Sequence, residues 1–129
     1  MTKEEIKNKL KRLNVLFVDD EEFVVETMKD ILPILFNKSY FALNGIDGIT
    51  IVQDNKIDII ITDLSMPKMN GIDMLKKIYT IDPDIKSICV SGHNESSFIK
   101  QAKELNSQYI IKPINSIQLY EVFEKVLED

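Results

Sequence analysis

The sequence has few of the features that would set it apart from an ordinary intracellular domain. Its single cysteine, Cys89, has no partner for an internal disulfide, so we expect a reducing, cytoplasmic location. The longest apolar runs, such as residues 59–61, are far too short to cross a bilayer, and the Lys-rich residues 1–11 lack the apolar core of a signal peptide. Positive charge is not in excess, because the net charge is −5. We therefore expect no direct binding to membranes or nucleic acid.

Internal repeats, low-complexity stretches and linkers rich in Pro, Gly or Ser are also lacking. The 129 residues fit a single domain that is long enough to bury a core without disulfides. We expect residues 13–129 to form this domain. Residues 1–12 are predicted to be an N-terminal extension, in which Ile6 and Leu10 favour a short helix.

Five short apolar segments predict strands, each of which stops at polar or turn-forming residues. These segments are residues 14–18, 39–43, 57–62, 85–90 and 108–111. Three of them are rich in Val and Ile without alternation, which is typical of strands buried on both faces of a parallel sheet.

Segments with helical spacing of apolar residues follow the strands. In the first of them, after the acidic start Glu21-Glu22, the shared face is predicted to consist of Phe23, Met28, Ile31, Leu32 and Leu35. Pro33 should kink or end this helix. The apolar positions of the later helices are Ile46, Ile49, Ile51, Val52; Ile72, Leu75, Ile78, Tyr79; Phe98, Ala102, Leu105; and Ile117, Tyr120, Phe123, Val126, Leu127. Strand followed by helix, five times over, predicts an α/β doubly wound (βα)5 sandwich with a parallel sheet.

Residues at the strand ends carry the chemistry, because ligands of such sheets bind beyond the carboxyl ends of the strands. Asp19 and Asp20 follow the first strand and Asp63 follows the third, so their carboxylates converge if these strands are neighbours. Grouped carboxylates need a cation at neutral pH, and oxygen ligands suit Mg²⁺. Ser91 and Lys112 would direct a hydroxyl and a positive charge at anionic oxygens. Together these residues predict an aspartate that accepts a phosphoryl group.

Four motifs at the strand ends carry a family resemblance. They are VLFVDDE at residues 15–21, TDLSMPKMNG at 62–71, VSG at 90–92 and YIIKP at 109–113. In this order and spacing they resemble the receiver domain of two-component response regulators, including the chemotaxis receiver. The resemblance covers residues 14–127 and implies a flavodoxin-like fold with five parallel strands in the order 2-1-3-4-5.

The resemblance also implies a role for each matching residue. Asp63 would be phosphorylated by a sensor histidine kinase, and Lys112 would contact the phosphoryl group. Ser91 would be the hydroxyl that moves toward the phosphate, with Tyr109 turning inward behind it, and the bond from Lys112 to Pro113 would be cis. The ligands of Mg²⁺ (or Mn²⁺) would be Asp20 and Asp63 directly, Asp19 through water, and the backbone carbonyl of Ser65.

The resulting hypothesis is a phosphorylation-activated signalling switch that catalyses only its own phosphorylation and dephosphorylation. As in the family, the change would appear on the face formed by the helix around Phe98, the strand 108–111 and the final helix. This face would regulate a partner protein or an output domain. The sequence leaves open whether the chain acts alone or belongs to a longer protein, and whether it forms a homodimer.

Three other functions compete with this hypothesis. A haloacid-dehalogenase-like phosphatase expects Asp-x-Asp after the first strand, where this chain has Asp19-Asp20-Glu21. A flavin or nucleotide binder needs a phosphate-binding loop at the same place, and none is present. A constitutive adaptor would keep the pocket without using it, so only chemistry can exclude it.

Position alone also suggests that His93 and Ser65 flank the pocket and tune hydrolysis of the acyl phosphate.

Overall fold

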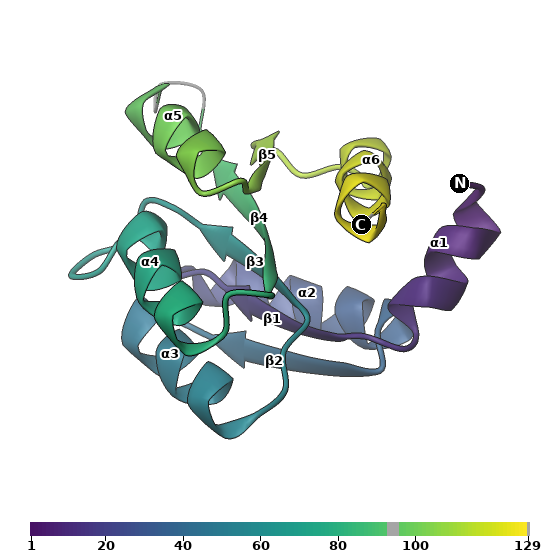
Figure 1. Cartoon of the computed structure of the whole chain (residues 1–129), viewed down its shortest axis with the longest axis horizontal. Coiled ribbons are helices and arrows are strands. Elements are labelled where there is room, and N and C mark those ends of the chain that lie inside the picture. Colours follow the sequence, from purple (N-terminus) through teal and green to yellow (C-terminus); the bar gives the residue numbers. More distant parts are fainter. Residues whose placement is uncertain (93–95, 129) are drawn as a thin grey trace.

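The protein is built around one parallel sheet. The computed structural model describes residues 1–92 and 96–128, so His93 lies outside the described residues. The five strands have the order β2-β1-β3-β4-β5, and six helices surround them in the described part (Figure 1). The predicted fold class and strand order are confirmed.

Strand boundaries agree with the predicted ones to within one or two residues. The strands are β1 Asn14–Val18, β2 Lys38–Ala42, β3 Ile59–Asp63, β4 Lys86–Ser91 and β5 Gln108–Ile111. The helices are α1 Lys3–Leu10, α2 Glu22–Leu35, α3 Gly45–Asp54, α4 Gly71–Ile81, α5 Ser96–Glu104 and α6 Ser116–Leu127. Within residues 1–92 and 96–128, no helix has the length and apolar character that a membrane span requires.

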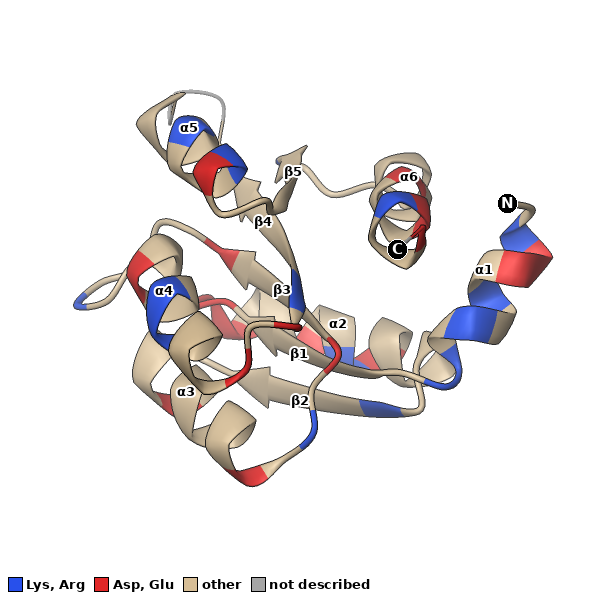
Figure 2. Cartoon of the chain, viewed as in Figure 1, with Lys and Arg blue, Asp and Glu red and all other residues tan. Residues whose placement is uncertain are grey.

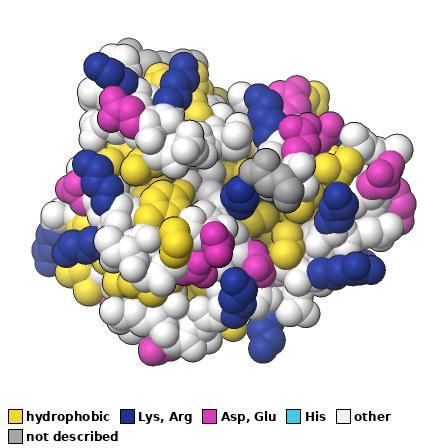
Figure 3. Space-filling model, viewed as in Figure 1, with side chains coloured by type: hydrophobic (Ala, Val, Ile, Leu, Met, Phe, Trp, Pro, Cys, Tyr) yellow, Lys and Arg dark blue, Asp and Glu magenta, His cyan; other side chains and the backbone are white. Residues whose placement is uncertain are grey.

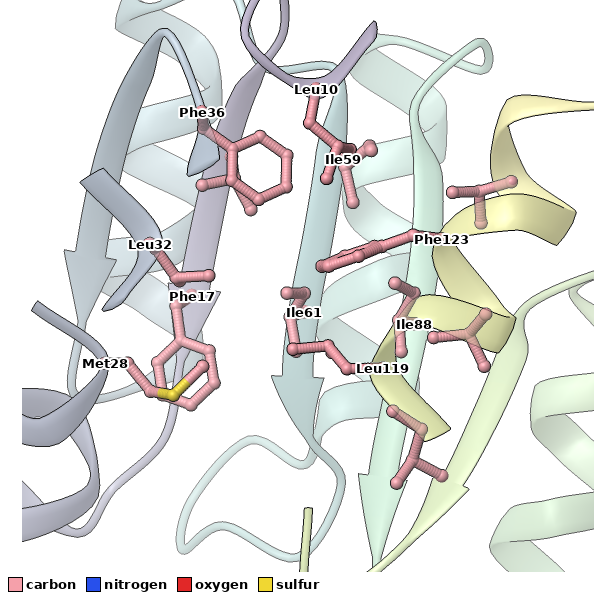
Figure 4. Close-up of a cluster of buried hydrophobic side chains, with 14 of the residues drawn as sticks. Leu10, Phe17, Met28, Leu32, Phe36, Ile59, Ile61, Ile88, Leu119 and Phe123 are labelled. Carbon is pink, nitrogen blue, oxygen red and sulfur yellow. The ribbon is translucent and has the colours of Figure 1, made fainter. Parts of the chain in front are cut away.

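Two apolar cores lie on opposite faces of the sheet, because successive strand residues point to opposite sides. Val15 and Phe17 of β1 join one core with α1, α2 and α6, while Leu16 and Val18 join the other with α3, α4 and α5. Figure 4 shows the first core, in which Phe123 of α6 is fully buried. On the face of the molecule in Figure 3, basic side chains are scattered among acidic ones.

The N-terminal extension contains a helix, as its sequence favoured. Thr2 and Glu5 form a capping box at the start of α1. Ile6 and Leu10 are buried in the first core, and Lys3 Nζ lies 5.4 Å from the centre of the Tyr120 ring on α6. The division into residues 1–12 and 13–129 stays a prediction.

The predicted buried face of α2 is wrong in part. Val25, Met28 and Leu32 are its buried residues, whereas Phe23 is 82% exposed and Ile31 41% exposed. Val25, Met28 and Leu32 are spaced by three and four residues, so they share the side of the helix that meets the sheet. Ile46 and Ile117, which were counted among the apolar positions of later helices, are exposed as well. Pro33 lies in the last turn of α2, which ends at Leu35.

Cys89 should be unreactive in the folded protein. The residue is fully buried in β4, and burial raises the pKa of its thiol from 9.0 to about 11. At pH 8 the thiolate is then about a hundredfold scarcer than at the ordinary pKa. We expect a disulfide reagent such as dithionitrobenzoate to label native protein at least about a hundredfold more slowly than protein unfolded in guanidinium. Equal labelling rates in the two states would contradict the buried position.

Candidate functional site

Five of the predicted site residues lie at one edge of the sheet. Asp19 and Asp20 directly follow β1, Asp63 and Ser91 are the last residues of β3 and β4, and Lys112 directly follows β5. All four strands are parallel, so their carboxyl ends meet at the same edge. Figure 2 shows the acidic segments at the ends of β1 and β3.

Three carboxylates form a cluster at this edge. One oxygen each of Asp19, Asp20 and Asp63 lies within 4.8 Å of the others. Asp19 and Asp63 are each 3% exposed, whereas Asp20 is exposed to solvent. Oxygen atoms this close repel one another when ionised, and a single hard cation can contact all three.

Burial dominates the electrostatics of the cluster. It raises the pKa of Asp63 from 3.8 to about 6, against the opposing charge of Lys112 and with a further contribution from the charge of Asp19. Burial also raises the pKa of Asp19, although the backbone N–H of Glu21 donates a hydrogen bond of 2.9 Å to its Oδ1. Near neutral pH the ionised carboxylates of the cluster are therefore destabilised by burial and by their mutual repulsion, and a bound cation would relieve both effects.

Lys112 supplies the one positive charge that the structure shows in contact with Asp63. Its Nζ lies 3.4 Å from Asp63 Oδ1, and its side chain is about one-third exposed. Partial burial acts against ionisation of the amine, but the charges of Asp63 and Asp19 prevail and raise the pKa of Lys112. Asp63 Oδ1 itself is buried and accepts no hydrogen bond from the residues that the structure describes. A buried carboxylate oxygen that has an ion pair but no hydrogen bond fits a metal ligand or a nucleophile.

The two predicted switch residues, Ser91 and Tyr109, are hydrogen-bonded to each other through their side chains. Ser91 Oγ lies 2.5 Å from Tyr109 Oη, and Ser91 is fully buried. The sequence predicted that this hydroxyl would be directed at anionic oxygens, whereas its short hydrogen bond in the structure is to Tyr109. The bond from Lys112 to Pro113 is cis, as the resemblance implied.

The loop between β3 and α4 is held at both ends. Leu64 is buried and donates its backbone N–H to Val90 O at 3.1 Å, while its carbonyl accepts the N–H of Gly71 at 2.9 Å. Asn70 then caps α4 through the N–H of Asp73. Ser65 lies in this loop and is exposed. Its carbonyl as a metal ligand stays a prediction.

An apolar groove of about 690 Å³, which sequence reasoning missed, opens beside the carboxylates. Its walls come from α2, with Phe23, Met28 and Ile31, and from residues 112–119. Asp19 and Lys112 line the groove too, so it is continuous with the acidic cluster. The signal in the sequence is the apolar residues Phe23 and Ile31, which the helical spacing predicts on one face with Met28 and Leu32.

Comparison with known proteins agrees with this arrangement. The chain is 33% identical over 114 residues to the chemotaxis protein CheY of Thermotoga maritima. The aligned region covers 87% of this chain and 95% of that protein. It is 30% identical over 109 residues to the transcriptional regulatory protein HptR of Staphylococcus aureus, covering 81% of this chain but only 42% of HptR. The chain thus spans less than half the length of that curated relative.

Solved structures give the same result. The fold superposes on a response regulator receiver domain protein from Clostridium thermocellum with a TM-score of 0.81 and 29% identity, over 89% of this chain and 94% of that one. The family model for the response regulator receiver domain matches residues 15–124, which carry the whole acidic cluster, Ser91 and Lys112. The chain therefore belongs to the family of response regulator receiver domains.

Proposed function

We propose that the chain is a phosphorylation-activated signalling switch in which Asp63 accepts a phosphoryl group from a sensor histidine kinase. Receiver domains take part in two-component signalling, and the relatives above include a chemotaxis protein and a transcriptional regulator. The observation that carries the proposal is Asp63 Oδ1, a buried carboxylate oxygen without a hydrogen bond, 3.4 Å from Lys112 and clustered with two other aspartates.

The chemistry follows from these positions. A carboxylate oxygen of Asp63 attacks the phosphorus, the bond from phosphorus to the donor's nitrogen or oxygen breaks, and an acyl phosphate results. Lys112 stabilises the charge of the phosphoryl oxygens. Asp19, Asp20, Asp63 and the carbonyl of Ser65 would hold Mg²⁺ (or Mn²⁺), which supplies additional charge neutralisation when bound. The chain would catalyse only its own phosphorylation and dephosphorylation.

The conformational response would start at Ser91. When its hydroxyl turns to a phosphoryl oxygen, the hydrogen bond to Tyr109 breaks, and β5 loses that link to β4. The surface formed by α5, β5 and α6 would then change and regulate a partner protein or an output domain. A homodimer through this surface belongs to the same proposal.

The apolar groove supports a docking position for the kinase. A protein that covers Phe23 and Ile31 comes to lie beside Lys112 and Asp19, which both line the groove. Phe23 is 82% exposed, so burying it on docking yields a favourable contribution from apolar contact. A phosphodonor bound there is placed next to its acceptor.

The proposal is tested by intact-mass spectrometry after incubation with Mg²⁺ and acetyl phosphate. We expect the wild type to gain one phosphoryl group and Asp63→Ala to gain none, because the acceptor oxygen is missing. Asp30→Ala, which removes an exposed carboxylate on α2, is the matched control and should be phosphorylated like the wild type. Omitting Mg²⁺ should slow the reaction, since repulsion within the carboxylate cluster is then unrelieved.

Two outcomes would contradict the proposal. If the wild type gains no phosphoryl group with or without Mg²⁺, the constitutive adaptor becomes the better interpretation. If Asp63→Ala is still phosphorylated, the acceptor is a different residue.

A further inference from the structure

A chain of hydrogen-bonded hydroxyl and thiol groups lies toward the amino-terminal end of β4 and β5, with Ser87, Cys89 and Ser107 buried and Tyr79 half-buried. Tyr79 Oη of α4 lies 2.5 Å from Ser87 Oγ of β4, and Ser87 Oγ donates to Ser107 Oγ at 2.7 Å. Cys89 Sγ lies 3.0 Å from the same Ser107 oxygen. Ser107 Oγ in turn donates to Gln108 O at 3.1 Å. Polar groups buried among apolar side chains are costly unless they are fully hydrogen-bonded, as these are.

Ser107 joins three elements at one point. It directly precedes β5, and its side chain bonds to Ser87 and Cys89 of β4. Its backbone N–H donates to Ala102 O of α5 at 2.9 Å, across Asn106, whose φ of 58° ends the helix in the left-handed conformation. Ser107 thereby fixes the end of α5 and the start of β5 to the same strand.

A second link between β4 and β5 is made at the carboxyl end of β4, which the side chain of Tyr109 reaches from the second residue of β5. There Ser91 Oγ bonds to Tyr109 Oη, and the backbone N–H of Lys112 donates to Ser91 O at 2.8 Å. Ser87, Cys89 and Ser91 are alternate residues of β4, so their side chains lie on one face of the sheet. Their hydrogen-bond partners Ser107 and Tyr109 lie across from them, just before and within β5. β5 has four residues and pairs with β4 alone, so these two links add to the backbone ladder that holds it on β4.

We propose that Ser107 is the pivot of the switch, a positioning residue that keeps the end of α5 and the start of β5 on β4 while the far end of β5 is released. Breaking the hydrogen bond between Ser91 and Tyr109 leaves only the backbone bond from the Lys112 N–H to Ser91 O in the link at Ser91 (the upper link), while the hydrogen bonds of Ser107 (the lower link) stay intact. The motion of β5 is then a rotation about Ser107 and not a detachment of the strand. The use of this rotation in signalling rests on the proposed function, but the pivot does not.

Two backbone amides report on the two links separately in hydrogen exchange measured by NMR. The Ser107 amide, bonded to Ala102 O, reports on the lower link, and the Lys112 amide, bonded to Ser91 O, reports on the upper link. Tyr109→Phe removes the upper side-chain bond without any phosphodonor. We expect it to speed exchange of the Lys112 amide about tenfold and to leave the Ser107 amide within about twofold of the wild type.

Ser107→Ala should give the opposite pattern, with exchange about tenfold faster at the Ser107 amide and little changed at Lys112. Ser87→Ala removes the same hydrogen bond from the β4 side and should reproduce the pattern, which keeps the test valid if Ser107→Ala folds poorly. Ser39→Ala is the matched control, because Ser39 Oγ is buried but has no hydrogen-bond partner among the described residues. It should change neither amide.

Three results would overturn the pivot. Equal acceleration of both amides in Tyr109→Phe would mean that β5 is released as a unit. Unchanged exchange of the Ser107 amide in both serine variants would mean that the side chain does not hold this junction. A uniform acceleration across all strands in those variants would mean a loss of global stability only. No phosphodonor is present, so failure of Asp63 to accept a phosphoryl group would leave these readings unaffected.

Discussion

Replacing Asp63 with asparagine is expected to stabilise the metal-free protein at pH 7.5, by about 1–3 kcal/mol in the free energy of unfolding. The carboxyl group has a folded-state pKa of about 6, against 3.8 as its ordinary value, because it is buried near Asp19. A raised acid pKa means that the folded protein holds the proton more tightly than the unfolded chain. Stability is therefore lost as the pH rises from about 3.8 through about 6.

Asparagine keeps the shape of the side chain and removes the charge, so the loss at neutral pH should disappear. Urea denaturation in EDTA measures the effect at pH 7.5 and again at pH 4.5, where Asp63 is largely protonated and the difference should shrink. Adding Mg²⁺ should stabilise the wild type at pH 7.5 and affect Asp63→Asn much less, because that variant lacks one of the clustered carboxylates.

Asp30→Asn serves as the control, since it neutralises an exposed aspartate on α2. Its free energy of unfolding should stay within about 0.5 kcal/mol of the wild type. A wild type that is more stable than Asp63→Asn at pH 7.5 without metal would show that Lys112 outweighs burial. The electrostatic account of the cluster would then be wrong.

Most of the fold could be predicted from the sequence because the strands are short, apolar and each followed by a polar residue. The end of β1 at Val18 and the polar residues Asp19 and Asp20 were assigned correctly from this contrast alone. The helix faces were harder. Phe23 and Ile31 have the same side-chain character as Met28 and Leu32, and only the packed structure shows which of them face the sheet.

The members of the candidate site could be named from the sequence, but their contacts could not. That Asp19, Asp20 and Asp63 meet follows from parallel strands with neighbouring ends. The bond between Ser91 and Tyr109 depends on side-chain rotamers across β4 and β5, which no spacing rule reports. Family membership also removes the dehalogenase-like phosphatase and the flavin binder as alternatives, whereas the adaptor awaits the phosphorylation test.

The buried chain around Ser107 was missed for a different reason. Serine is common in and around turns, and Ser107 directly follows one at Leu105 and Asn106, so its hydroxyl carried no signal by itself. A signal did exist in the alternation of Ser87, Cys89 and Ser91, which are small polar or sulfur-containing residues on one face of a strand that carries Ile88 and Val90 on the other. Such alternation within a buried strand indicates that polar partners lie opposite.

Gly71→Ala should be among the most damaging single substitutions in the protein. A Cβ at Gly71 would lie 2.5 Å from Asp63 O, 2.7 Å from Leu64 Cδ2 and 3.0 Å from Leu64 Cα. Two of these atoms belong to the backbone, so no rotation of a side chain relieves the contact. The loop that follows Asp63 must move instead, and the hydrogen bond from the Gly71 N–H to Leu64 O is lost with it.

We expect Gly71→Ala to lower the free energy of unfolding by about 2–4 kcal/mol in urea denaturation. Uptake of a phosphoryl group from acetyl phosphate should fall more than about tenfold even in the fraction that is folded, because a shift of about 1 Å in the reacting carboxylate is costly. Gly92→Ala is the matched control, since a Cβ there meets no atom of the described residues within 4 Å and the folded protein should keep its stability. If Gly71→Ala unfolded at the same urea concentration as Gly92→Ala, the close approach of α4 to the end of β3 would be wrong. The position of Asp63 relative to α4 would then be wrong as well.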